Sequence, residues 1–160
     1  MFHLCKCEES VRLMLVWGWR MAGVLLKGSA KSEISYELVH DQSGARLLTM
    51  APLDNGGDGS SFSPTDLCAV SLGACASTIM GIYARKKGFS LSVSFELLKE
   101  METSPRRIAS IRVVYNIATG CEDSEFEVLK NLARNCPVRK SLHPDILIHE
   151  EFIRRNEPCS

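Results

Sequence analysis

The residues most able to do chemistry in this sequence are its cysteines, and two of them stand out by their surroundings. The chain contains 7 cysteines, an odd number at irregular spacing, whereas disulfide-stapled secreted domains carry an even number at regular spacing. We therefore expect a reducing compartment in which most thiols behave as small apolar side chains and one or two are reactive. The cysteines are Cys5, Cys7, Cys68, Cys75, Cys121, Cys136 and Cys159.

Cys136 stands directly before Pro137, a residue that suits the first position of a helical turn. At the N-cap of such a turn, unpaired N–H groups favour the thiolate form. The basic residues Arg134, Arg139 and Lys140 lie nearby, and we expect them to lower the pKa of this thiol further. The competing interpretation is that Cys-Pro simply ends the preceding helix.

Cys75 lies near the middle of a long predicted helix, residues 64–87, and a cysteine there is commonly a packing residue. Cys68 lies seven residues earlier, about 10.5 Å along the helix axis. A disulfide requires Cα atoms within about 7 Å, so any partner for Cys75 comes from elsewhere in the chain. Small residues recur at every fourth position and predict close approach of another backbone: Ala69, Gly73, Ser77 and Gly81.

Composition limits the classes of protein to consider. The chain has 160 residues, 45% of them hydrophobic, and its 19 basic side chains balance 19 acidic ones. This length predicts one domain with a real core, and the balanced charge predicts no binding to nucleic acid. Residues 11–26 resemble a secretion signal but are interrupted by Arg20. Residues 67–84 are uncharged but rich in small side chains, which favours a buried helix over a membrane span.

The elements that position these cysteines follow from turn and periodicity signals. Residues 32–52 predict a β-hairpin that turns at Gly44, followed by a loop over residues 54–61. Ser63 as N-cap, Pro64 at the first helical position and Asp66 three residues after the cap predict the start of the long helix. Gly88 predicts its end.

The second half of the chain alternates apolar and polar residues in two stretches that predict a long hairpin, residues 89–119. A second helix is expected to begin at a cap formed by Asp123 or Ser124, and a short turn over residues 137–142 and a closing strand over residues 145–153 follow. This order predicts an α+β fold with mainly antiparallel strands. We expect residues 1–30 to be an N-terminal extension, with Met21 as a possible natural start, and residues 31–160 to form a single domain.

Two segments resemble the OsmC/Ohr family, the osmotically inducible and organic hydroperoxide resistance proteins. Residues 63–67 (SPTDL), 71–75 (SLGAC) and 83–88 (YARKKG) are similar to the family's central helix. Residues 135–142 (NCPVRKSL) are similar to its Cys-Pro segment. The resemblance covers about residues 32–153 and includes both cysteine contexts in the expected order.

The resemblance implies a fold and an activity. The fold is an intertwined homodimer in which curved, mainly antiparallel sheets pack around two central helices. The activity is reduction of organic hydroperoxides, in which Cys75 is the peroxidatic cysteine and Cys136 resolves its sulfenic acid to a disulfide. An external dithiol, of the lipoyl or thioredoxin-like kind, then reduces the disulfide. No bound cofactor or metal, nucleic acid or membrane is implied, and the expected location is the cytoplasm.

The chain departs from the family at the groups that orient the thiolate. Peroxidase members use an arginine from the N-terminal region and a glutamate near the start of the central helix. Thr65 stands at the glutamate position, Asp66 follows it, and Arg46 is the candidate substitute for the arginine. Asp66 is also expected to complete the capping box of the long helix. The sequence therefore resembles a divergent branch of the family.

Two alternatives remain open from the sequence. The first is a non-catalytic relative with the same fold, which binds a hydrophobic ligand near Cys75 or acts as a redox sensor. The second is a metal site formed by His3, Cys5 and Cys7 with a distant ligand such as His143. The Cys-x-Cys spacing lacks the paired CxxC pattern that is typical of zinc sites, which makes the metal site the weaker hypothesis.

Overall fold

The computed structural model describes residues 23–155, which divide between residues 48 and 49 into two compact units. The expected start at Met21, together with Cys5, Cys7 and Cys159, lies outside the described residues. So does His3, the first ligand of the alternative metal site.

The N-terminal sheet has the order β1-β2-β3, and β1 and β2 are antiparallel. Its strands are β1 (Leu26–Ser32), β2 (Ser35–His40) and β3 (Arg46–Met50). The predicted hairpin is confirmed as β2 and β3, and the turn residue Gly44 adopts a φ of 70°, which glycine tolerates without strain. Strand β1 was not predicted, because every residue in it is exposed and no alternation of apolar residues marks it. It crosses the expected boundary at residue 30, and that boundary stays a prediction.

Helix α2 (Pro64–Lys87) begins and ends where its capping residues predict. The Ser63 side chain accepts a hydrogen bond from the Asp66 N–H, and the Asp66 carboxylate accepts one from the Ser63 N–H, which completes the predicted capping box. Gly88 ends the helix with a φ of 81°, a conformation that L side chains rarely adopt. A short 3-10 turn, η1 (Leu53–Asn55), precedes the helix.

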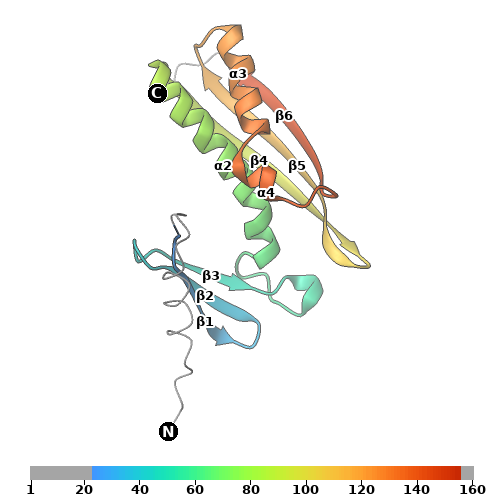
Figure 1. The fold of residues 1–160 in the computed structure, drawn as a ribbon. Coiled ribbons are helices and arrows are strands. Elements are labelled where there is room, and N and C mark those ends of the chain that lie inside the picture. Colours follow the sequence, from blue (N-terminus) through green and yellow to red (C-terminus); the bar gives the residue numbers. More distant parts are fainter. Residues whose placement is uncertain (1–22, 156–160) are drawn as a thin grey trace. The chain divides into compact units, whose positions relative to one another are not determined.

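The second sheet has the order β4-β5-β6 and lies in the C-terminal unit (Figure 1). Strands β4 (Leu91–Thr103) and β5 (Arg106–Thr119) form the predicted antiparallel hairpin. Strand β6 (Leu147–Arg155) pairs with β5 in parallel. The crossover connection through α3 and α4 brings the chain back to the end of the sheet where β5 begins, so that β6 runs in the same direction as β5. The fold is α+β with mainly antiparallel strands, as predicted.

Helix α3 (Asp123–Arg134) and the short helix α4 (Pro137–Ser141) precede the closing strand. The N-cap of α3 is Glu122, and its side chain makes no capping hydrogen bond, so the prediction of a cap at Asp123 or Ser124 was wrong by one or two residues. Asp123 instead lies in the first turn, where its charge suits the helix dipole, and its carboxylate pairs with Arg154.

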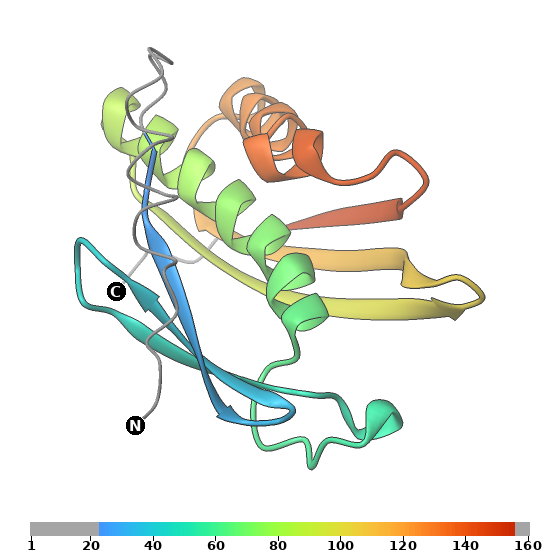
Figure 2. The ribbon, with the colours of Figure 1, turned by 60° about the horizontal axis from the view of Figure 1, so that its bottom comes forward.

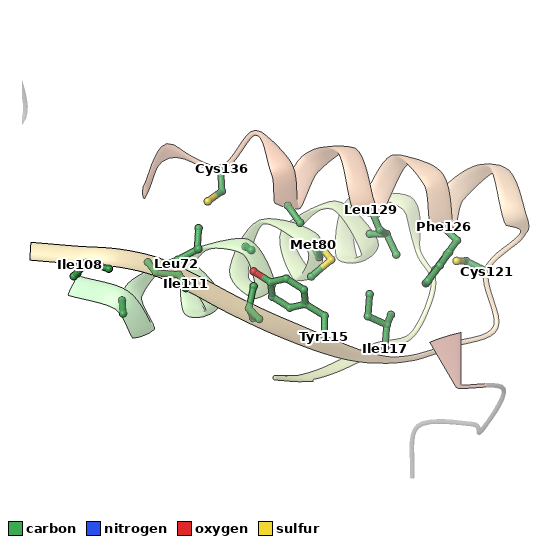
Figure 3. Close-up of a cluster of buried hydrophobic side chains, with 14 residues drawn as sticks. Leu72, Met80, Ile108, Ile111, Tyr115, Ile117, Cys121, Phe126, Leu129 and Cys136 are labelled. Atoms are coloured by element: carbon green, nitrogen blue, oxygen red, sulfur yellow. The ribbon is translucent and has the colours of Figure 1, made fainter. Parts of the chain in front are cut away.

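One apolar core joins α2, α3 and the inner face of the sheet. Both helices lie on the same face of the β4-β5-β6 sheet (Figure 2). Met80 of α2, Leu129 of α3 and Ile117 of β5 are fully buried between them (Figure 3). The Tyr115 ring of β5 stacks on Phe152 of β6 with ring centroids 5.0 Å apart. This core fixes the end of α3, where the first candidate cysteine lies.

Helix α2 is long and apolar enough, by length and composition alone, to cross a membrane. Core helices of soluble proteins pass the same test, and α2 buries six of its residues within the protein: Ala69, Leu72, Gly73, Ala76, Met80 and Ala84. Its packing against β4 and α3 is what the sequence-based prediction of a buried helix requires.

Candidate active site

Cys136 is held at the junction between α3 and α4. Pro137 starts α4, and the Cys136 sulfur accepts a hydrogen bond from the backbone N–H of Arg139 at 3.3 Å. The thiol is fully buried in the core cluster (Figure 3). The predicted N-cap position is therefore confirmed, and the sulfur faces inward rather than toward solvent.

Cys75 comes from the middle of α2 and is half-buried against the same cluster that contains Cys136. Both cysteines carry free thiols. The two thiols lie close enough for Cys75 to contribute to the raised pKa of Cys136. The fold thus brings together two cysteines that are 61 positions apart in the chain.

Burial raises the pKa of the Cys136 thiol above its ordinary value. The Arg139 N–H opposes this shift, while Cys75 and Glu150 add to it. The N–H at the N-cap lowers the pKa as predicted, but burial outweighs it, so the prediction of a lowered pKa was wrong. Arg139 does lie next to Cys136 in the structure, but its guanidinium binds a carboxylate and not the sulfur.

That carboxylate belongs to Glu150 of β6, and it is bound to Arg139 Nη1 at 2.5 Å. Only 4% of the Glu150 side chain is exposed, and its burial raises the pKa of the carboxyl group even though Arg139 and Arg134 oppose the rise. Arg134 also lies over the Phe152 ring, 5.2 Å from its centroid. An ion pair between the buried Glu150 and the half-buried Arg139 therefore lies beside Cys136.

Tyr115 completes the surroundings of the thiols. Its side chain is fully buried, and burial raises the pKa of its phenol, with further contributions from Glu150, Cys136 and Cys75. Within residues 23–155, the Tyr115 hydroxyl has no hydrogen-bond partner. Figure 3 shows the ring extending from β5 toward the helices of the core cluster.

The other candidate residues of the long helix lie at its N-terminal end. Thr65 and Asp66 are ten and nine residues before Cys75, about 14 Å or more along the axis. Both bind Lys99 of β4, whose Nζ lies 2.8 Å from Thr65 Oγ1 and 2.6 Å from Asp66 Oδ1. Within the chain, these groups therefore form a separate polar cluster.

This cluster lines a cavity of about 680 Å³ at the start of α2. Its walls combine the Lys99 and Asp66 side chains with apolar ones. The apolar lining residues include Phe62, Val70, Phe95 and Leu97.

Arg46, the candidate substitute for the family's arginine, lies in β3 of the N-terminal sheet. Its Nη1 binds Glu37 Oε2 of β2 at 2.7 Å, and Lys31 lies 3.4 Å from the same oxygen. In this pairing the arginine has an exposed cross-strand carboxylate as its partner.

Lys99 and Glu150 were missed from the sequence, although each left a signal. In β4, Lys99 continues the inward positions occupied by Val93, Phe95 and Leu97, where an apolar residue is expected. In β6, Glu150 occupies the inward position between Ile148 and Phe152. In both strands, a charged residue at a position where the alternation predicts an inward apolar side chain was the signal for a functional residue.

The remaining described cysteines are free thiols: Cys68 is exposed and Cys121 is buried. Among residues 23–155, no three His, Cys, Asp or Glu side chains cluster in a way that could hold a metal ion. His143, the distant ligand of the alternative metal site, lies 3.6 Å from Asp145 in the loop before β6.

The C-terminal unit is a two-layer α+β fold with one free cysteine in its central helix α2 and another in the Cys-Pro turn before α4. Residues 57–151 match the model of the family described as OsmC-like protein. The chain belongs to this family.

Solved structures share the fold. A protein from Psychrobacter arcticus is 33% identical, with a TM-score of 0.76, and the match covers 86% of this chain and 99% of that one. The organic hydroperoxide resistance protein OsmC of Legionella pneumophila is 20% identical, with a TM-score of 0.61 and coverage of 83% and 98%. The organic hydroperoxide resistance protein OhrB of Bacillus subtilis is 14% identical, with a TM-score of 0.57 and coverage of 82% and 98%. No curated protein matches the chain.

Proposed function

We propose that this protein is a thiol-dependent peroxidase that reduces organic hydroperoxides, with Cys75 as the peroxidatic and Cys136 as the resolving cysteine. One observation carries the proposal: two free thiols from distant segments interact inside an otherwise apolar cluster. The half-buried Cys75 is the more accessible of the two, which suits the residue that meets the substrate.

The proposed cycle has three steps. The Cys75 thiolate attacks the distal oxygen of the hydroperoxide, the O–O bond breaks, and the leaving alkoxide takes a proton to become an alcohol. Cys136 then attacks the Cys75 sulfenic acid, an S–S bond forms, the S–O bond breaks, and hydroxide leaves with the thiol proton as water. An external dithiol of the lipoyl or thioredoxin-like kind reduces the disulfide and is itself oxidised to a disulfide.

Family membership supports a redox or stress role, and two proteins of similar fold are named organic hydroperoxide resistance proteins. The apolar surroundings of the thiols, among them Leu72, Met80 and Phe95, favour an alkyl or lipid hydroperoxide over hydrogen peroxide. We further propose a cytoplasmic homodimer that needs no bound cofactor, metal, nucleic acid or membrane.

The test is to count thiols and measure intact mass before and after one equivalent of cumene hydroperoxide, in wild type and in the Cys75→Ser and Cys136→Ser variants. We expect wild type to lose two thiols and form a Cys75–Cys136 disulfide. Without its resolving partner, Cys136→Ser should stop at a Cys75 sulfenic acid that dimedone traps. Cys68→Ser is the matched control, because Cys68 is exposed on the same helix and should leave the disulfide unchanged. Survival of both thiols through minutes of excess peroxide would contradict the proposal.

A second candidate is a non-catalytic relative that binds a hydrophobic ligand or senses redox state. The cavity at the start of α2 favours the ligand-binding form, because its walls are mainly apolar and Lys99, which binds Asp66 there, is a cation that an acidic head group could share. Fluorescent fatty acid binding that Lys99→Met weakens, together with thiols that do not react with peroxide, would favour this candidate.

A further inference from the structure

Glu150 occupies a position where the fold calls for an apolar side chain. In the parallel pairing of β5 and β6 it lies beside Val113, which is fully buried. Its inward neighbours along β6 are Ile148 and Phe152, both of which pack against the core cluster. Removing a carboxylate from water is unfavourable even when it is paired, so an apolar residue here would favour stability. The retained acid points to a role in the chemistry of the site.

Arg139 links this carboxylate to the Cys136 sulfur. Its guanidinium binds Glu150 Oε2 at 2.5 Å, and its own backbone N–H donates to Cys136 Sγ at 3.3 Å. The ion pair therefore fastens the turn that carries Cys136 to the closing strand of the sheet. A lysine could not replace the arginine without loss, because the planar guanidinium fixes the direction of its hydrogen bonds.

Two buried polar atoms near the thiols have no hydrogen-bond partner among residues 23–155: Glu150 Oε1 and the Tyr115 hydroxyl oxygen. A buried polar atom without a hydrogen bond lowers the stability of the fold. Both residues act electrostatically on Cys136 or are acted on by it. The unpaired oxygens therefore lie in the same small region as the thiol.

We propose that Arg139 and Glu150 are a positioning pair that holds Cys136 buried beside Cys75, so that peroxide meets Cys75 first and Cys136 reacts after the sulfenic acid has formed. The inference rests on the proposed peroxidase function. It adds the reason why Cys75 acts as the peroxidatic and Cys136 as the resolving cysteine. Burial and the Glu150 charge raise the pKa of Cys136, while the Arg139 N–H lowers it, and the Arg139 guanidinium is paired with Glu150.

The groups that face Cys136 come from every element packed around it. They are Cys75 of α2, Arg139 of α4, Tyr115 of β5 and Glu150 of β6, while Arg134 of α3 acts on Glu150. When Cys136 attacks the Cys75 sulfenic acid, its proton leaves with the hydroxide as water, so no proton has to remain in the core. Glu150 touches neither substrate nor the breaking bonds in this scheme, and its role is positional.

The first test uses no peroxide. In the Cys75→Ser background, the rate at which iodoacetamide alkylates Cys136 is measured by peptide mass spectrometry from pH 6 to pH 10, with and without Glu150→Gln. We expect Glu150→Gln to move the midpoint of the pH profile down by about one unit, which is about 10-fold more thiolate at a fixed lower pH. Glu150→Asp, which restores the charge, should return the midpoint toward that of the parent.

Glu151→Gln is the matched control, because Glu151 is the next residue of β6 and points away from the core. A purely structural role for Glu150 would raise alkylation equally at every pH and leave the midpoint in place. That result, or an equal shift in Glu151→Gln, would overturn the inference.

The second test adds cumene hydroperoxide to the same variants and follows dimedone labelling of Cys136. We expect no label in Cys75→Ser and clear label once Glu150→Gln is added, because Cys136 then becomes a peroxide-reactive thiolate. If wild-type Cys75 never reacts with peroxide while the alkylation midpoint still shifts, the peroxidase proposal fails and the positioning pair stands. If Cys75 reacts with peroxide but Glu150→Gln leaves the alkylation midpoint of Cys136 unchanged, the peroxidase proposal stands and the positioning pair is overturned.

Discussion

The Asp66 carboxylate serves both its own helix and the neighbouring strand. One oxygen accepts the Ser63 N–H at 2.7 Å, and the other binds Lys99 Nζ at 2.6 Å. Partial burial raises the pKa of this carboxyl group, but the hydrogen bonds from Lys99 and Ser63 outweigh burial and hold the pKa below its ordinary value of 3.8. The charged form is therefore favoured in the folded protein.

A pH dependence of stability follows from this lowered pKa. Because the folded protein binds the Asp66 proton less tightly than the unfolded chain, the contribution of Asp66 is present above pH 3.8 and is lost as the pH falls through the lower folded value. Asp66→Asn should unfold more easily at pH 7 by about 0.5 kcal/mol, because the lost charge is 40% exposed and partly screened by solvent. Urea unfolding from pH 2.5 to pH 7 measures the difference, which should shrink toward low pH. A difference that is constant with pH would exclude a role for the charge.

At the scale of elements, the small residues of α2 allow the helix to lie directly on the sheet. A Cβ atom built on Gly73 would come within 2.4 Å of the Phe95 ring of β4. At Gly81, two turns further along, a Cβ atom would meet nothing within 4 Å. The predicted ridge of small residues is therefore a close contact at Gly73 and open at Gly81.

Alanine substitution at these two glycines should have opposite effects. Gly73→Ala forces the Phe95 ring to move and should destabilise the protein by about 1–3 kcal/mol. Gly81→Ala meets no atom and should stabilise the helix by about 0.5–1 kcal/mol, because alanine has the higher helix propensity. Thermal and urea unfolding of the two variants provide the comparison. Equal shifts of the same sign would contradict the close contact.

At the scale of the whole molecule, the chain consists of two compact units. Both proposed reactive thiols belong to the second unit, and the match to the family model begins in that unit, at residue 57. The homodimer that we propose would add a second copy of both units. Both thiols of the proposed pair come from one chain.

The proposed homodimer can be checked by mass alone. With a chain mass of 17.7 kDa, light scattering after size exclusion should give about twice that value at micromolar concentration. The same sample treated with cumene hydroperoxide should run as a single chain of 17.7 kDa on a denaturing, non-reducing gel, because the expected disulfide is intramolecular. A disulfide-linked dimer band would contradict the assignment of Cys136 as the resolving partner within one chain.

Much of the fold could be predicted because local patterns carried it. The Ser63–Asp66 capping box, the αL glycine Gly88 and the alternation of β4 and β5 depend on neighbours a few residues away. Strand β1 was missed because it has no such pattern, and the parallel direction of β6 was missed because it is set by the crossover through α3 and α4. Cys75 and Cys136 were identified from their contexts and from the family resemblance.

The sequence by itself determined the helices, the main strands and the two cysteines, since each is encoded in residue type and short-range spacing. Only the tertiary structure decided that Arg139 turns to Glu150 rather than to the thiol, and that Lys99 pairs with Asp66. Such pairs depend on which strand lies beside which helix and on the register between them. It also decided the direction of the Cys136 pKa shift, because desolvation depends on how completely the folded core surrounds the sulfur.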